Sequence, residues 1–206
     1  LTGITKTGRT HLMDAMPVTL TQTNTSWEQQ IVFALSGIKA LQKGIQTLAL
    51  GGTAVGTGIN SHPKFARQAV KELNKITNIE FTNPESFFPL MSSQDTAVSL
   101  SGALKTLAVS LMKISNDLRW MNSGPLAGIG EITLEALQPG SSIMPGKVNP
   151  VIPESTTMVC AEVIGNDSTV TLAGQSGNFE LNVMLPIIAE KLISSITILS
   201  ASCHLM

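Results

Sequence analysis

The chain has 206 residues, enough for one or two ordinary domains with a substantial core. Its 13 Lys and Arg residues nearly balance its 14 Asp and Glu residues, so the charge does not indicate nucleic acid or an anionic membrane as a partner. Charged residues make up only 13% of the chain and hydrophobic residues 43%, which favours a subunit that buries part of its surface against other subunits. The sequence contains no run of eighteen apolar residues, so no membrane span is predicted.

Apolar residues spaced alternately by four and three predict the first long helix, over residues 21–48. This heptad seam consists of Trp27, Ile31, Ala34, Ile38, Leu41, Ile45 and Leu48. A shorter helix is predicted over 63–76, with Ser61 as its N-cap.

Three further helices are predicted in the second half of the chain. The segment 93–121 repeats the heptad spacing, and 154–173 begins near Pro153 but is interrupted by Gly165, Asn166 and Asp167. The last helix covers 181–204, where Pro186 marks a start or a kink. Because no segment alternates with a period of two, we expect no sheet, and the fold class is all-α, a bundle of long helices.

Polar, glycine-rich segments lie between these helices. Residues 140–149 read Gly-Ser-Ser-Ile-Met-Pro-Gly-Lys-Val-Asn, and their glycines and proline predict an irregular loop. Two hydroxyls, a cation and an amide in one loop suit carboxylate chemistry. A helical oligomerisation scaffold without catalysis is the alternative, although a scaffold would not need such loops.

Two other segments carry candidate ligand-binding residues. His11 follows Thr10 upstream of the first long helix, where we expect backbone donors at the helix start to face an anion. Arg9 either binds a carboxylate or pairs with Asp14. The segment 51–60 is rich in glycine but lacks P-loop spacing, so we interpret it as a closely packed connection.

These motifs, in this order, resemble class II fumarases of the fumarase/aspartase superfamily. The resemblance covers almost the whole chain and rests on Gly8-Arg-Thr-His-Leu, Gly51-Gly-Thr-Ala-Val-Gly-Thr-Gly, Ser123-Gly-Pro, the 140–149 loop with Pro150, and Gly165-Asn-Asp. Aspartate ammonia-lyase is the close alternative, but Gly52, Gly146 and the run after Gly174 are similar to fumarases. Leu126 departs from the family, which usually has arginine there, so one customary positive charge is missing.

The resemblance implies reversible anti addition of water to fumarate, giving L-malate. Ser141 would be the catalytic base, although its neighbour Ser142 could exchange roles with it, and Lys147 and Asn149 would hold the aci-carboxylate. The remaining roles fall to Thr10, which would bind a substrate carboxylate, and to the pair of His11 and Glu154, which would handle the water.

The resemblance also implies that residues 1–206 are a central helical domain without the N-terminal and C-terminal domains of the family. The missing initiator Met likewise indicates a fragment or a processed chain. We expect a homotetramer formed through the bundle, a dicarboxylate substrate, and neither metal nor organic cofactor. Cys160 and Cys203 fit no metal spacing and are predicted to be buried thiols in a reducing compartment, the cytoplasm or, in a eukaryote, the mitochondrial matrix.

Overall fold

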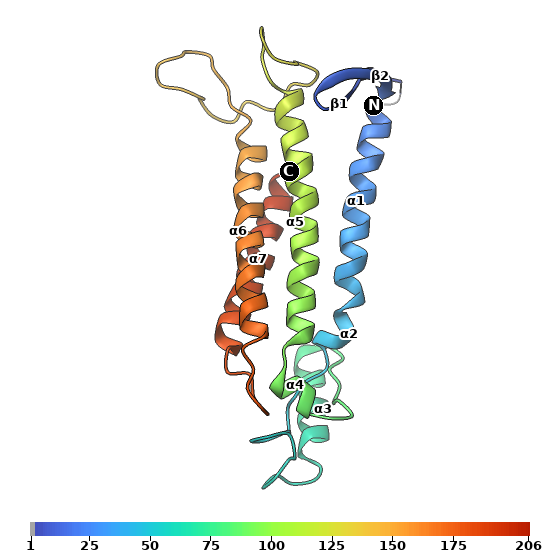
Figure 1. Ribbon diagram of the computed structural model, residues 1–206, viewed down its shortest axis with the longest axis vertical. Coiled ribbons are helices and arrows are strands. Elements are labelled where there is room, and N and C mark those ends of the chain that lie inside the picture. Colours follow the sequence, from blue (N-terminus) through green and yellow to red (C-terminus); the bar gives the residue numbers. More distant parts are fainter. Residues whose placement is uncertain (1–2) are drawn as a thin grey trace. The chain divides into compact units, whose positions relative to one another are not determined.

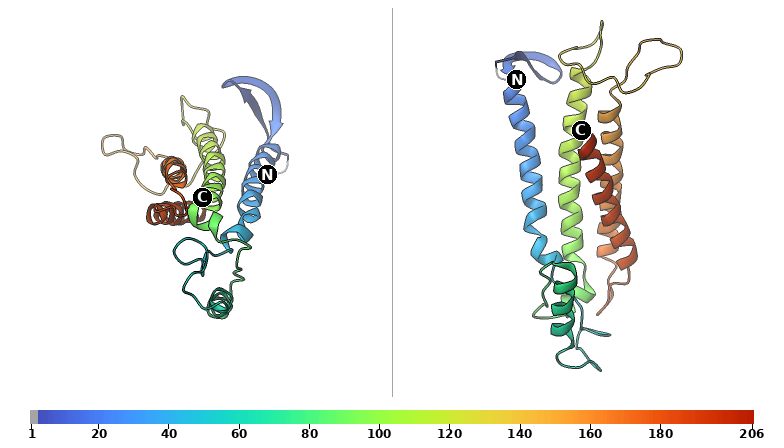
Figure 2. Two further views of the ribbon diagram at one scale, coloured as in Figure 1. Left: turned by 60° about the horizontal axis from the view of Figure 1, so that its bottom comes forward. Right: turned by 180° about the vertical axis from the view of Figure 1, so that it is seen from behind.

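The computed structural model describes residues 3–206, which form two compact units. The first unit takes in the described residues up to Leu35 together with Thr106–Glu162 and Ile198–Met206; the second takes in Ser36–Lys105 and Val163–Thr197. Figure 1 shows the elements of both units in chain order, and Figure 2 shows them from two further directions.

The expected helices are present, with shifted ends and one addition. In chain order they are α1 (Leu20–Ala40), α2 (Gln42–Ile45), α3 (Phe65–Thr77), α4 (Phe88–Ser92), α5 (Asp95–Met121), α6 (Val151–Gly174) and α7 (Leu185–Leu205). The first predicted helix is divided at Leu41, and α4 was not predicted. The predicted interruption of α6 is wrong, because its two polar residues are satisfied in place: Asn166 donates to Ser195 Oγ at 3.1 Å, and Asp167 pairs with Lys105 at 2.5 Å.

A capping box sets the start of α1. The backbone N–H of Gln22 donates to Thr19 Oγ1 at 3.1 Å, and the backbone N–H of Thr19 donates back to Gln22 Oε1 at 2.9 Å. This reciprocal pair satisfies free donors of the first helical turn. At α3 the predicted cap is wrong: the residue before the helix is Lys64, and Ser61 Oγ donates to Gly58 O instead.

The expectation that there is no sheet is wrong. β1 (Thr5–Thr10) and β2 (Met13–Thr19) form an antiparallel hairpin ahead of α1. A bulge between Thr7 and Arg9 shifts the register, so the strands do not show the strict alternation of a regular pair. β1 reads Thr-Lys-Thr-Gly-Arg-Thr, without an apolar residue, which explains why a search for apolar residues with a period of two misses the hairpin.

In the first unit, parts of α1, α5, α6 and α7 surround an apolar core. Its most buried residues include Ala108, Leu111 and Ile114 from α5 and Cys160 from α6. Polar contacts join neighbouring helices: Trp27 Nε1 donates to Asp117 Oδ2 at 3.3 Å, and Ser202 Oγ donates to Thr156 Oγ1 at 2.9 Å. The seam of α5 therefore faces inward, whereas in the first seam Ala34 is buried and Ile45 is 42% exposed.

In the second unit, Val170, Ala173 and Ile188 form a core cluster against α5. The 51–60 segment is closely packed, as predicted from the sequence. A Cβ atom on Gly51 would lie 2.4 Å from Ala66 Cβ, and one on Gly52 would lie 2.5 Å from Met91 Sδ. Close approach of neighbouring side chains, rather than ligand contact, explains these two glycines.

By length and composition alone, α5 and α7 are apolar enough to cross a membrane, although the sequence contains no run of eighteen apolar residues. In the most apolar 18-residue segment of each helix, only 33% of the residues of α5 and 22% of the residues of α7 are buried within the chain. Core helices of soluble proteins pass the same criterion. On α5, Lys105 and Lys113 also form ion pairs, with Asp167 and Asp117 respectively.

Candidate functional site

His11 and Thr10 lie at the hairpin that precedes α1. Thr10 ends β1, and His11 and Leu12 form the two-residue turn with φ of 54° and 62°. Left-handed backbone at both turn positions matches the right-handed twist of a hairpin, but it strains residues that have a Cβ. The expectation that His11 lies where a helix start presents backbone donors is wrong, because β2 separates His11 from α1, which begins at Leu20. His11 instead projects from an exposed turn.

Salt bridges hold the hairpin from the side of β1. Arg9 Nε lies 3.7 Å from Asp14 Oδ1, which confirms that ion pair as one of the two alternatives for Arg9. A second, closer partner was missed by sequence reasoning: Arg9 Nη1 lies 2.7 Å from Glu131 Oε1. The two residues are separated by 122 positions, and no local pattern signals such a contact.

The 140–149 loop is irregular, as predicted, and its ends are tied together. The backbone N–H of Gly140 donates to Lys147 O at 2.7 Å, and Asn149 Nδ2 donates to Gly140 O at 3.1 Å. A Cβ on Gly140 would lie only 2.8 Å from both Lys147 O and Asn149 Oδ1, so this neck requires glycine. Part of the hydrogen-bonding capacity of the Asn149 side chain therefore closes the loop in the free chain.

The two serines differ in their surroundings. Ser141 is half-buried, and its Oγ accepts a hydrogen bond from the backbone N–H of Ile143 at 3.3 Å. Ser142 and Lys147 are exposed. A backbone donor aimed at the Ser141 oxygen would stabilise negative charge on it, which favours Ser141 over Ser142 as the group that ionises.

Glu154 lies in the first turn of α6, directly after the loop. Its backbone N–H donates to Pro150 O at 3.1 Å, and its side chain is half-buried. A carboxylate in the first turn is favoured by the helix dipole.

The chain brings the candidates into one unit but into two groups. Thr10 and His11 form the hairpin group; Ser141, Ser142, Lys147, Asn149 and Glu154 form the loop group. Among residues 3–206, no hydrogen bond or ion pair joins His11 to Glu154 or Ser141 to Lys147. The pairing of His11 with Glu154 therefore stays a prediction, one for an assembly rather than for this single chain.

A cavity of about 510 Å³ lies against the hairpin, and it contains none of the candidate residues. Its lining consists of Ile4, Thr5, Lys6, Thr7, Ala15, Pro17, Leu20 and Glu131.

The two cysteines differ in exposure. Cys160 is fully buried; burial, followed by the neighbouring Cys203 sulfur, raises the pKa of its thiol to about 11. Cys203 is exposed, so its predicted burial is wrong, although partial desolvation also raises its thiol pKa. Raised pKa values keep both thiols protonated and poorly reactive at neutral pH. Within the described part of the chain, no group of three or more His, Cys, Asp or Glu side chains is arranged to hold a metal.

A model of the lyase family matches residues 2–165, and the chain belongs to this family. It is 63% identical over 201 residues to the class II fumarate hydratase 2 of Pseudomonas aeruginosa, covering 98% of this chain and 44% of that protein. It is 59% identical to the class II fumarate hydratase of Xylella fastidiosa, covering 97% of this chain and 42% of the relative.

A solved structure agrees with these sequence matches. The class II fumarase of Schistosoma mansoni superposes with a TM-score of 0.95 at 38% identity, over 97% of this chain and 45% of that one. The chain thus spans less than half the length of the relatives it matches.

Proposed function

We propose that the protein containing this chain is a class II fumarate hydratase, which adds water to fumarate reversibly to give L-malate, as in the tricarboxylic acid cycle. Residues 1–206 would be its central helical domain. The observation that carries the proposal is the 140–149 loop with its half-buried, backbone-supported Ser141, in a chain 63% identical to a class II fumarate hydratase.

The step of highest free energy in the reaction forms one charged intermediate. In the direction from malate, removal of a proton from the carbon beside a carboxylate drives charge into that carboxylate. Fixed cationic and amide donors lower the energy of such a dianion. Lys147 and the second N–H of the Asn149 amide would serve here, and Thr10 would hold a substrate carboxylate.

Proton transfer requires a base on one face of the substrate and an acid on the other. Ser141 would take the carbon-bound proton as an alkoxide, supported by the Ile143 N–H, and Ser142 is the alternative. On the opposite face His11, oriented by Glu154, would donate a proton to the departing hydroxyl, which leaves as water.

An assembly would bring the two groups together. Large apolar side chains remain exposed on all four long helices: Phe33 at 71%, Met158 at 70%, Ile193 at 64% and Val109 at 53%. Exposed apolar surface of this kind marks an association surface. We propose a homotetramer in which the hairpin of one copy meets the loop of another, and in which further copies cover α5 and α7.

The proposed setting is the cytoplasm, or the mitochondrial matrix if the source is a eukaryote. The proposed ligand is a small dicarboxylate, and a near-neutral charge balance offers no attraction for nucleic acid.

The full-length parent should hydrate fumarate without added metal or organic cofactor. The assay follows the loss of fumarate absorbance, with and without prior chelation. Chelation that abolishes activity, with recovery on adding metal, would refute the cofactor-free mechanism. Faster addition of ammonia than of water would instead identify an aspartate ammonia-lyase. A parent protein that catalyses neither reaction would support the hypothesis of a non-catalytic scaffold.

The 206-residue chain by itself should associate, as a tetramer, yet show little or no hydration of fumarate. Its helices expose too much apolar surface for a stable monomer, and the relatives contain more than twice its length. Because positioning contributes heavily to catalysis, an incomplete set of substrate contacts should lose most of the rate. Light scattering gives the mass and the absorbance assay gives the activity of the same sample; a monomer, or turnover near that of the parent, would contradict this prediction.

A further inference from the structure

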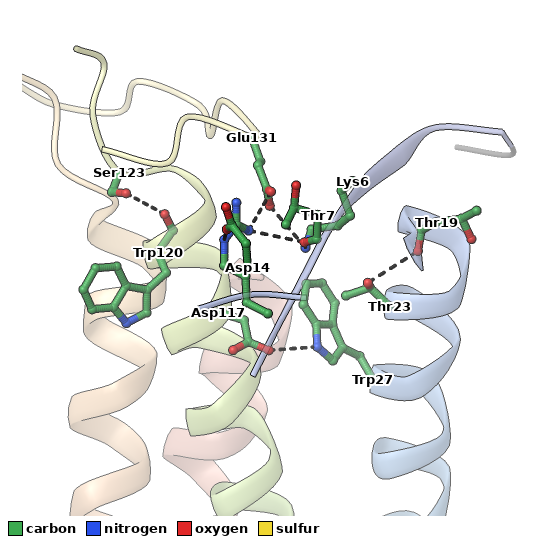
Figure 3. A network of polar contacts seen from close by, with 11 residues as sticks. Lys6, Thr7, Asp14, Thr19, Thr23, Trp27, Asp117, Trp120, Ser123 and Glu131 are labelled. Atoms are coloured by element: carbon green, nitrogen blue, oxygen red, sulfur yellow. Dashed lines mark hydrogen bonds and ion pairs between the residues drawn. The ribbon is translucent and has the colours of Figure 1, made fainter. Parts of the chain in front are cut away.

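We propose that Glu131 is a positioning residue, which clamps the hairpin carrying Thr10 and His11 to the end of α5; the catalytic part of this inference rests on the proposed function. Figure 3 shows the Glu131 side chain reaching from its loop toward Lys6 and Thr7 of the hairpin. The clamp is defined as Glu131 with Lys6 and Arg9.

The backbone of Glu131 is anchored independently of the hairpin. Its N–H donates to Met121 O at 2.8 Å, and the next residue, Ile132, donates to the same carbonyl at 3.2 Å. Met121 is the buried last residue of α5, and Gly130 is held in turn by Ser123 O at 2.8 Å. Glu131 therefore extends from a fixed point on the helix end.

The Glu131 carboxylate meets two cations of β1. Arg9 Nη1 lies 2.7 Å from Oε1, and Lys6 Nζ lies 3.3 Å from Oε2 while donating to Thr7 O at 2.7 Å. The side chains of Glu131 and Lys6 are only 15% and 13% exposed. A shielded pair of this kind is held much more firmly than one in open water, and removing the carboxylate leaves two partly buried cations facing each other.

A bulge lies opposite the part of β1 between the two cations. Between the pairs Thr7–Pro17 and Arg9–Asp14, β1 has one residue and β2 has two, so the extra residue of the bulge lies on β2. Gly8 is required there, because a Cβ would lie 2.5 Å from Met16 O.

The clamp acts one residue away from the candidate site. Arg9 immediately precedes Thr10 and His11, whose strained turn has no helix start to support it. The same loop that holds Arg9 through Glu131 continues into Ser141 and Lys147. Glu131 therefore sets where the hairpin group is presented.

The test replaces Glu131 in the full-length parent by glutamine, which removes the charge and keeps the shape. We expect kcat/KM for fumarate to fall on the order of 10- to 100-fold, through both a lower kcat per folded site and a higher KM, because misplacement of about 1 Å costs that much. Glu131→Asp, which keeps the carboxylate, should recover part of the loss. The matched control is Glu135→Gln, which removes the same charge from an exposed position of the same loop and should leave the kinetics unchanged.

Hydrogen exchange separates the clamp from the catalytic proposal. In Glu131→Gln the amides of residues 5–19 should exchange faster while those of α6 keep their protection. Unchanged hairpin exchange refutes the clamp. Faster exchange with unchanged kcat and KM refutes the positioning role. That role is also refuted if the loss of activity in Glu131→Gln is fully explained by a smaller amount of folded protein. A wild-type parent that does not hydrate fumarate refutes the proposed function, and exchange alone then decides the clamp.

Discussion

Ser141→Ala in the full-length parent should lower the turnover number on the order of 100-fold or more, the size expected for loss of a catalytic base. A group that acts in proton transfer stabilises the transition state rather than the bound substrate, so KM for fumarate should change little by comparison. Initial rates over a range of fumarate concentrations separate the two quantities.

The matched control for this variant is the adjacent serine. Ser142 is exposed, whereas Ser141 is half-buried and accepts the Ile143 N–H, so Ser142→Ala should have the smaller effect. Near-normal turnover in Ser141→Ala, with a large loss in Ser142→Ala, would transfer the role of base to Ser142.

Lys147→Ala should damage both binding and turnover, with a loss in kcat/KM on the order of 100-fold or more. The ammonium would contact a substrate carboxylate in the ground state and the dianion in the transition state, so both constants should respond. Steady-state kinetics and the affinity for a non-reacting dicarboxylate measure the two contributions.

The structure gives a reason to expect an intact loop in this variant. Lys147 closes the neck through its backbone carbonyl, which accepts from Gly140, and alanine keeps that carbonyl. Lys147→Arg keeps the charge and should retain part of the dicarboxylate affinity. Unchanged affinity and turnover in Lys147→Ala would remove this residue from the site.

The most successful predictions from the sequence concern the long helices, because the buried side of a helix has an apolar residue every three or four positions. The seam of α5 is an example, since Leu104, Leu107, Leu111 and Ile114 are all buried. The glycines and the proline of residues 140–149 are also a local signal, which predicts an irregular loop, and the loop is irregular.

The hairpin and the clamp depend on the tertiary structure. β1 contains no apolar residue, so it has no apolar alternation that a strand search could detect, and the partner of Arg9 lies 122 residues away. Exposure of Cys203 and the apparent membrane-spanning character of α5 and α7 likewise depend on which helix faces are covered.

By itself, the sequence determined the positions of the long helices, the irregular course of the 140–149 loop and the resemblance to class II fumarases, because each depends on residues that are close together in the sequence. Only the tertiary structure decided that His11 lies in a hairpin turn, that Asn149 closes its own loop and that Glu131 holds Lys6 and Arg9. The contact between Arg9 and Glu131 joins residues 122 positions apart, and the other two features depend on backbone register and hydrogen-bond partners that residue types alone do not specify.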